Sequence, residues 1–455
     1  MNAVNRLAQY REWLQDIEPI TAKGAVDQVT GLIIEGRGPV ASIGDMCDIY
    51  PRLTPVPIKA EVVGFKGEHL LLMPLSDMRG VHPGSLIVNR AEKATVQASL
   101  ALQGRVLDGL GRPMDAQGPI PVGVPYPLYA EPFNPLRKKR IAEPLDLGVR
   151  ALNGLLTCGK GQRMGIFAGS GVGKSVLLGM IARATQADVN VIALIGERGR
   201  EVREFIDRDL GPEGLQRSVV VVATSDQSPL VRMRGAYVAT ALAEYFRDQG
   251  KDVLLMMDSL TRFAMAQREV GLSVGEPPMT KGYTPSVFAL LPKLLERAGN
   301  ADGPGSITGL YTVLIENDDF NDPISDAVRS ILDGHLLLSR DLAAKNHYPA
   351  IQISHSLSRV MRDITSPEHR ELAGKLREVL AIYQEAEDLI TIGAYAKGSS
   401  SKIDYAIALI DAVNAYLCQQ IDESASFEDS LQQLRDLFAH RYEYSALSVN
   451  HQPRL

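Results

Sequence analysis

The stretch Ala168-Gly-Ser-Gly-Val-Gly-Lys-Ser175 decides the fold class of this chain. It follows an apolar run of strand length, Met164–Ala168, and it precedes a segment with helical periodicity, Ser175–Ala187. A phosphate-binding loop requires this strand–loop–helix context. Glycines let backbone N–H groups point inward around phosphates, and the helix N-terminus adds its positive end. The usual pattern begins with glycine, whereas this chain has Ala168, a residue small enough to keep the loop tight.

Two side chains of the loop indicate how it would bind a nucleoside triphosphate with Mg²⁺. The Lys174 ammonium can reach the β and γ phosphates, and the Ser175 hydroxyl can ligate Mg²⁺. A chance glycine-rich turn is the competing interpretation, but it leaves the strand, the lysine and the serine unexplained. The residues expected to bind the nucleotide are Ala168, Gly169, Ser170, Gly171, Val172, Gly173, Lys174 and Ser175.

Two acidic residues follow apolar strands, at the edge where parallel sheets bind ligands. Asp258 closes the run Val253–Met257 and is placed to hold Mg²⁺, usually through water. The alternative is that Asp258 caps a helix starting at Ser259. Glu197 follows another apolar run and would sit one strand over, where a carboxylate can polarise an attacking water. By itself Glu197 could be an ordinary charged turn, but the phosphate loop and Asp258 favour a catalytic role.

The pattern around the loop predicts a mostly parallel, doubly wound sheet over residues 151–350, because apolar strands alternate with helices there. The expected strands are Met164–Ala168, Val189–Ile195, Val219–Ala223, Val253–Met257, Ile307–Ile315 and His335–Leu338. The expected helices are Ser175–Ala187, Arg200–Asp209, one entered at Ser228-Pro229, and Ser286–Ala298.

The segments on either side of this core have sequence patterns that differ from the alternating strands and helices of the core. Residues 23–95 predict a small β-barrel, since short β runs are split there by Gly, Pro and Asp. The expected runs are Gly31–Ile34, Val40–Ile43, Glu61–Phe65 and Leu70–Met73. Residues 96–150 are predicted to be a proline-rich linker into the core, and its basic run Arg137–Arg140 is interpreted as solvated surface. Residues 351–440 predict a helical domain with helices at Glu368–Ile390, Lys402–Gln420 and Phe427–Phe438, followed by a flexible tail, 441–455.

Residues 1–22 predict an amphipathic helix, because Val4, Leu7, Leu14 and Ile17 fall near one face together with the only tryptophan. Two interpretations stay open. The helix could pack on its own domain, or it could dock on a partner or a membrane surface.

Composition excludes several classes of protein. The 455 residues carry 48 Lys and Arg against 54 Asp and Glu, a net charge of −6, which argues against nucleic acid as the main partner. Three widely separated cysteines give neither a disulfide framework nor a metal site, and this fits a reducing cytosol. No apolar stretch approaches the length of a membrane span, and the N-terminus lacks a signal-peptide core.

Several motifs resemble a known family over nearly the whole chain. Gly104-Arg-Val-Leu-Asp-Gly, Gly159-Lys-Gly-Gln-Arg163, Gly196-Glu-Arg and Tyr348-Pro-Ala-Ile resemble the α and β subunits of rotary ATP synthases. Phe167–Ser175, Glu276-Pro-Pro-Met-Thr-Lys-Gly-Tyr283 and Gly393-Ala-Tyr-Ala-Lys-Gly398 are closer still to the type III protein-export ATPases, the last one to their flagellar branch. The resemblance implies a RecA-like nucleotide-binding domain and the ligands ATP and Mg²⁺.

The resemblance also implies roles for individual residues. Glu197 matches the catalytic glutamate of the active subunit, where the non-catalytic subunit has glutamine, and Arg198 matches the arginine beside it. Arg359 matches an arginine finger that reaches the γ-phosphate of the neighbouring subunit, and Tyr348 matches an aromatic residue on the adenine. From spacing alone, Tyr348 could be a core residue and Arg359 a surface residue. Gln352 departs from the family, which has Asp, Asn or His there.

The function that the resemblance implies is Mg²⁺-dependent ATP hydrolysis by a homohexameric ring that energises flagellar protein export. The implied partners are other copies of the chain, a regulatory subunit on the N-terminal helix, a central stalk, export-gate membrane proteins and chaperone–substrate complexes, with no nucleic acid. The implied location is cytoplasmic, peripheral to the inner membrane. The alternatives are a virulence-type secretion ATPase, an RNA-dependent ring ATPase and a non-catalytic nucleotide-binding subunit, against which Glu197 argues.

Overall fold

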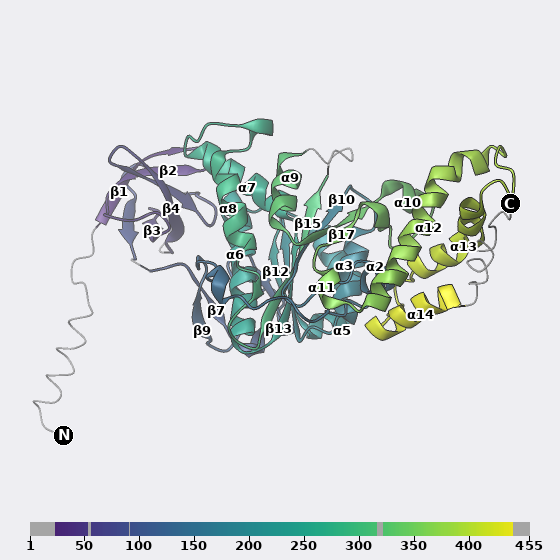
Figure 1. The fold of residues 1–455 in the computed structure, drawn as a ribbon. Helices are drawn as coiled ribbons and strands as arrows, with labels where there is room; N and C mark the ends of the chain where they lie inside the picture. The colour runs from purple at the N-terminus through teal and green to yellow at the C-terminus, as the bar shows by residue number, and fades with distance from the viewer. Residues whose placement is uncertain (1–22, 53–55, 91, 316–321, 440–455) are drawn as a thin grey trace, which may run out of the picture.

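The computed structural model describes residues 23–52, 56–90, 92–315 and 322–439, and it shows three parts in a row (Figure 1). A β-barrel comes first, a sheet covered by helices lies in the middle, and a helical region follows. This arrangement confirms the predicted fold class. The predicted N-terminal helix, 1–22, and the predicted tail, 441–455, lie outside the described residues.

The barrel is closed and antiparallel, with strand order β1-β2-β5-β4-β3-β6. Its strands are β1 (Lys23–Thr30), β2 (Ile33–Arg37), β3 (Met46–Tyr50), β4 (Ile58–Lys66), β5 (His69–Pro74) and β6 (Leu86–Asn89). Alternate residues of these strands, such as Ile34, Val62 and Leu72, fill the barrel and are fully buried. Every strand therefore contributes to one apolar interior.

One predicted barrel strand, Val40–Ile43, is wrong. These residues form a loop between β2 and β3, and Val40 and Ile43 are 92% and 68% exposed. The reason is local, because Gly38-Pro39 ends β2 and the next strand starts only at Met46. β-branched residues favour strands only where a second strand or a core receives them, and this loop has neither.

The central sheet has the order β17-β16-β10-β15-β13-β11-β12-β8, and β14 pairs with β15. All pairs from β16 to β8 are parallel, whereas β14 and β17 pair antiparallel. The strands are β8 (Val106–Asp108), β10 (Arg163–Ala168), β11 (Val189–Ile195), β12 (Ser218–Ala223), β13 (Asp252–Asp258), β14 (Gly299–Asn300), β15 (Ser306–Leu314), β16 (Gly334–Leu338) and β17 (Leu357–Ser358). The edge strand β8 comes from the stretch that was expected to be a linker.

Helices cover both faces of this sheet because its strands are apolar on both sides. Residues such as Val191 and Leu255 pack under α6 (Pro229–Asp248), α7 (Leu260–Ser273) and α8 (Pro285–Leu295). Their neighbours Ile192 and Leu254 face α3 (Lys174–Ala184) and α2 (Arg150–Leu155). The remaining helices here are α4 (Gly199–Glu204), the π-helix η3 (Phe205–Leu210), α5 (Gly211–Gln216), α9 (Pro323–Ile331) and α10 (Arg340–Ala344).

The connections are short elements with defined partners. β7 (Thr95–Ala98) pairs with β9 (Val124–Pro127), and the single-turn helices are η1 (Leu100–Leu102), η2 (Pro135–Arg137), η4 (Thr280–Gly282), η6 (Ile353–His355) and α11 (Met361–Ile364). The basic run Arg137–Arg140 begins at the end of η2 and is mostly exposed, as expected, although it also forms ion pairs. Arg137 pairs with Asp302, and the Lys138 Nζ lies 2.8 Å from Oε2 of Glu296. These ion pairs link the connecting segment to the central domain.

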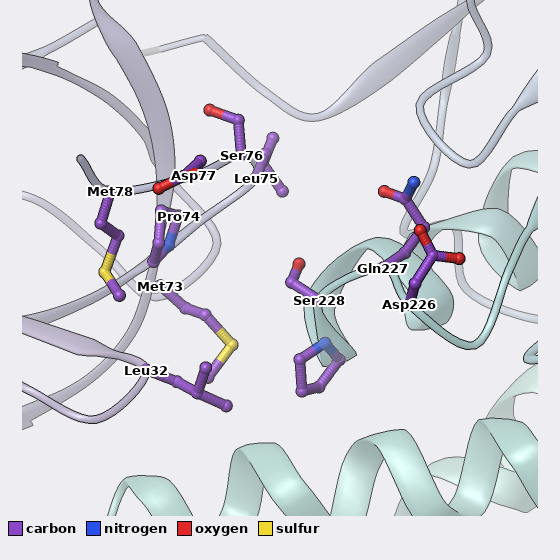
Figure 2. Close-up of a pocket in the computed structure, with 11 residues that line it drawn as sticks. Leu32, Met73, Pro74, Leu75, Ser76, Asp77, Met78, Asp226, Gln227 and Ser228 are labelled. Carbon is purple, nitrogen blue, oxygen red and sulfur yellow. The ribbon is translucent and has the colours of Figure 1, made fainter.

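The barrel meets the core at α6 through a buried ion pair. Nη1 of Arg234 on α6 lies 3.0 Å from Oε2 of Glu61 on β4, and the Tyr129 hydroxyl donates to Oε1 of Glu61 at 3.0 Å. Beside this junction, a pocket of about 380 Å³ separates barrel residues 73–78 from residues 226–229 at the start of α6 (Figure 2). The pocket adjoins the end of β12, so three strands separate it from the phosphate-loop strand β10.

The C-terminal region consists of α12 (Pro367–Thr391), α13 (Ser401–Leu417) and α14 (Phe427–Ala439). Its apolar residues join the core on the α2 and α3 side of the sheet. Gln419, just after α13, donates to the Gly148 carbonyl and accepts from the Arg150 N–H, which ties this region to the start of α2. Within the described ranges, no helix combines the length and the apolar character that crossing a membrane would require.

Candidate nucleotide site

The phosphate loop connects β10 directly to α3. Gly171 and Gly173 have φ angles of +79° and +88°, a conformation that glycine adopts without strain. Val172 between them is buried and anchors the loop in the core. Ala168 is the last residue of β10, where it pairs with Leu314 on β15, so its methyl group is buried within the sheet. Alanine at the first position of the pattern is therefore compatible with the loop.

The structure brings Lys174, Asp258 and Glu197 together. The Lys174 ammonium pairs with Oδ1 of Asp258 and lies 3.7 Å from Oε1 of Glu197. Asp258 ends β13, Glu197 follows β11, and these two strands are adjacent in the sheet. All three side chains are at most 16% exposed. Ser259, rather than Asp258, caps α7, because its hydroxyl accepts from the Arg262 N–H. Asp258 is thus free for a role in the site.

Burial and mutual charge determine how these groups titrate. Burial, reinforced by the negative charge of Asp258, raises the pKa of Glu197 to about 7. Burial opposes the charge of Lys174, but the carboxylates of Asp258 and Glu197 outweigh it and raise the pKa of the ammonium. Oδ1 of Asp258 also accepts a hydrogen bond of 2.7 Å from the Thr312 hydroxyl. A glutamate with a pKa near neutrality suits a residue that must accept a proton.

Two further residues of the site were not predicted from the sequence. Glu201 on α4 lines a cavity of about 50 Å³ together with Ser175, Glu197 and Asp258. Burial raises the pKa of Glu201, but hydrogen bonds with Glu197 and with the Arg198 N–H, together with the charges of Arg198 and Arg200, outweigh burial and lower this pKa. The available signal was that Glu201 lies in the first turn of the helix that starts two residues after Glu197.

Arg262 is the second residue near the site that was not predicted from the sequence. Its side chain lies so close to Gly196 that a Cβ there would be 2.8 Å from the Cβ of Arg262. Its Nε is buried and makes no hydrogen bond among the described residues. A buried guanidinium nitrogen beside the Glu197 loop could donate to a phosphate. No sequence pattern marks Arg262, which is simply the third residue of α7.

The remaining predicted residues have different positions. Tyr348 is 39% exposed and lies over the phosphate loop, because a Cβ on Gly173 would be 3.4 Å from its ring. Arg198 is 78% exposed and pairs with Oε1 of Glu201 at 3.3 Å, so its side chain faces solvent. Arg359 is exposed beyond β17 at the edge of the sheet, with its charge near His335. Gln352 pairs through its main-chain N–H with the Leu337 carbonyl.

The residues present fit ATP with Mg²⁺. The Ser175 hydroxyl and the Asp258 carboxylate line the same cavity, and Oε1 of Glu197 is buried without a hydrogen-bond partner among the described residues. Over the described ranges, no group of three or more His, Cys, Asp or Glu residues could hold a metal by itself. Phosphate oxygens and water usually complete the Mg²⁺ shell in such sites, so two protein oxygens suffice.

Comparison with known proteins gives matches along nearly the whole chain. The ATP synthase alpha/beta family, nucleotide-binding domain, matches residues 148–358, and the T3SS EscN ATPase C-terminal domain matches residues 365–436. The flagellum-specific ATP synthase of Bacillus subtilis is 55% identical over 91% of this chain and 94% of its own length. The type 3 secretion system ATPase of Xanthomonas euvesicatoria is 52% identical over 90% of this chain and 93% of its own length.

Solved structures agree with these matches. The assembled ATPase EscN from the type III secretion system of enteropathogenic E. coli superposes with a TM-score of 0.85 at 46% identity, covering 91% of this chain and 99% of that chain. EscN in complex with its central stalk EscO superposes with a TM-score of 0.84 at the same identity and coverage. The chain is thus a P-loop ATPase, and it belongs to the ATP synthase α/β family, in the branch of the flagellum-specific ATP synthases and type 3 secretion system ATPases.

Proposed function

We propose that this ATPase works as a Mg²⁺-dependent homohexameric ring that energises flagellar protein export. The observation that carries the catalytic part is the cluster of Lys174, Asp258 and Glu197 at the end of the phosphate loop. The export part rests on the relatives, which are flagellum-specific ATP synthases and type 3 secretion system ATPases. A glutamate at position 197 favours hydrolysis over nucleotide binding alone, because only a carboxylate can accept a proton from water there.

The mechanism follows from the positions of the side chains. Lys174 leaves Asp258 and binds the β and γ phosphates when ATP enters, and Tyr348 packs on the adenine. Glu197 orients a water molecule and accepts its proton. Mg²⁺, held by the Ser175 hydroxyl and by Asp258 through water, would neutralise phosphate charge. Arg359 is exposed and lies beside the start of β10, at the opposite end of that strand from its own phosphate loop, so it is proposed to act on the neighbouring copy. Arg198 would turn inward from Glu201 once the phosphates are present.

The proposed ring and its partners rest on different grounds. Self-association and a central stalk are supported by the assembled EscN and by its complex with EscO. A regulatory subunit on residues 1–22 is supported by the amphipathic pattern of that segment. Export-gate membrane proteins, chaperone–substrate complexes and a cytoplasmic location at the inner membrane complete the proposal. The net charge of −6 fits a protein without a nucleic-acid partner.

Glu197→Gln is expected to lower kcat by at least about a hundredfold, because a positioned general base contributes on that scale. ATP binding should remain, since the amide keeps the size of the side chain. The wild-type kcat/KM should rise with pH through about 7, where Glu197 loses its proton, and this acidic limb should be absent in the variant. Steady-state ATPase assays from pH 5.5 to 8.5 measure both effects. Loss of binding with normal turnover per bound ATP would make Glu197 a structural residue.

The export function is tested in cells that carry Glu197→Gln in place of the wild-type gene. We expect loss of motility and loss of secreted flagellar subunits, with intact secretion by any virulence system in the same strain. The reverse pattern would assign the chain to virulence secretion. Purified wild-type protein assayed with and without RNA provides the remaining comparison, because RNA-stimulated turnover would favour an RNA-dependent ring ATPase.

A further inference from the structure

The main chain of Arg359 is held in place by a frame that contains one buried amide side chain, that of Gln162. Gln162 directly precedes β10 and is fully buried. Its Oε1 accepts a hydrogen bond of 2.9 Å from the Gly159 N–H. Its Nε2 donates to the Asp333 carbonyl oxygen and to the Ser358 hydroxyl oxygen, both at 3.1 Å. Because a main-chain N–H only donates and a carbonyl only accepts, the partners fix the orientation of this amide.

Both acceptors of Gln162 touch the arginine directly. The Asp333 carbonyl also accepts the main-chain N–H of Arg359 at 3.0 Å, so two hydrogen bonds meet on this oxygen. Ser358 is the residue before Arg359, and its hydroxyl donates to the Thr157 carbonyl at 2.7 Å. Gln162 therefore bridges the two residues that set the backbone position of Arg359.

Further hydrogen bonds and close contacts restrict the backbone on either side of Arg359. Arg163 holds the Asp333 carboxylate through its main-chain N–H at 3.1 Å and its Nε at 3.0 Å. Strand β17 pairs with β16 through only two residue pairs. A Cβ on Gly334 would lie 2.5 Å from the Leu357 carbonyl oxygen, so the two strands approach as closely as glycine permits. With so short a pairing, side-chain hydrogen bonds such as the one from Gln162 to the Ser358 hydroxyl add to what holds β17 in place.

The Arg359 side chain depends on this backbone for its placement. It is exposed, and among the described residues it forms no salt bridge that would orient it. A catalytic group displaced by about 1 Å can lose about a hundredfold in rate. A shift of this backbone would therefore displace the Arg359 guanidinium from any group that it contacts.

We propose that Gln162 is a positioning residue for catalysis in the neighbouring copy, where it fixes Arg359 for the γ-phosphate that the neighbour binds. This inference rests on the proposed trans role of Arg359. Gln162 lies at one end of β10, and the phosphate loop of its own chain begins at the other end. The competing possibility is therefore that Gln162 acts on its own phosphate loop through the strand.

Gln162→Met tests the proposal, since methionine keeps the length of the side chain and removes the amide. We expect kcat to fall about 10–100-fold, with the Kd for ATP within about twofold of wild type. Gln267→Met is the matched control, because Gln267 is a buried amide on α7 whose hydrogen bond of 2.8 Å goes to the Ser286 hydroxyl. It should keep wild-type kcat. Ser358→Ala is a milder second variant for the case in which Gln162→Met does not fold.

Mixed rings decide on which site Gln162 acts. Gln162→Met chains mixed with Lys174→Ala chains should regain activity, because the first supply intact phosphate loops and the second supply well-placed Arg359. Gln162→Met chains mixed with Arg359→Ala chains should regain none, because both lack a well-placed arginine. Ser358→Ala should give the same pattern.

Two outcomes overturn the proposal. Recovery with Arg359→Ala but not with Lys174→Ala would show that Gln162 serves its own phosphate loop, and recovery with neither would make it a general folding residue. A reference mixture of Lys174→Ala with Arg359→Ala separates these results from a failure of the proposed function. If the reference recovers activity, the trans arginine stands and only the role of Gln162 is in question. If the reference itself does not recover, both proposals fail.

Discussion

Lys174→Ala is expected to abolish ATP hydrolysis, with a fall in kcat of at least about a thousandfold. The ammonium is the group that is proposed to neutralise the β and γ phosphates, and it lies beside Asp258 and Glu197 in the structure. Its loss removes a buried cation and leaves two carboxylates facing each other. Phosphate release during steady-state turnover measures the effect, and circular dichroism checks the fold.

Lys66→Ala is the matched control for this variant. Lys66 is a surface lysine on the barrel strand β4, 69% exposed, and its Nζ lies 3.4 Å from Oε1 of Glu35. Because exposed ion pairs contribute little, this variant should keep wild-type turnover. Wild-type turnover by a folded Lys174→Ala protein would refute the assignment of the site.

Arg359→Ala is expected to lower kcat by about 10³–10⁵-fold, the range of an arginine that neutralises charge on a transferring phosphoryl group. The position of Arg359 is the reason to expect action in trans. Ser358 pairs with Gly334 at the start of β16, so Arg359 lies beside the start of β10, whereas the phosphate loop and Lys174 follow the end of that strand. Turnover per chain should therefore rise with protein concentration as rings form. Binding of ATP to single chains should not change with concentration.

Mixing the two variants tests the same point without relying on concentration. Chains with Lys174→Ala keep Arg359, and chains with Arg359→Ala keep the phosphate loop, so a mixed ring contains interfaces with one complete site. Each variant alone should be nearly inactive, and the mixture should recover part of the wild-type rate. Co-assembled mixtures without recovery would count against a trans role, as would full activity in a proven monomer.

The sequence predicted well the parts of the molecule that depend on local pattern. The buried strand Val189–Ile195 was predicted to the residue, and its neighbours to within one residue at each end, because both faces of a parallel sheet demand an unbroken apolar run. The phosphate loop was predicted for a similar reason, since its glycines and lysine are contiguous. Val40–Ile43 failed because its β-branched residues have no second strand to receive them, and pattern alone does not show that.

The parts that were missed depend on contacts between distant segments. β8 comes from a short stretch, Val106–Asp108, that is a strand only because β12 offers a free edge. Arg262 joins the site because its side chain packs on Gly196, a residue of another strand-end loop. The exposed basic run at Arg137 pairs with Asp302, a residue far away in the sequence. Hydrophobic periodicity carries no information about contacts between distant segments, so these contacts could not be predicted from the sequence.

The pairing of Lys174 with Asp258 also has a consequence for which form of nucleotide the chain accepts. The carboxylates of Asp258 and Glu197 already offset the charge of this lysine within its own chain. If Lys174 binds the phosphates as proposed, binding exchanges one anion for another at this ammonium, and it releases two carboxylates to face the incoming polyanion. A bare nucleotide would meet that repulsion uncompensated, whereas a nucleotide that carries a divalent cation brings the compensating charge with it. On the proposed mechanism, the ion pair therefore favours ligands by their net charge rather than by their shape.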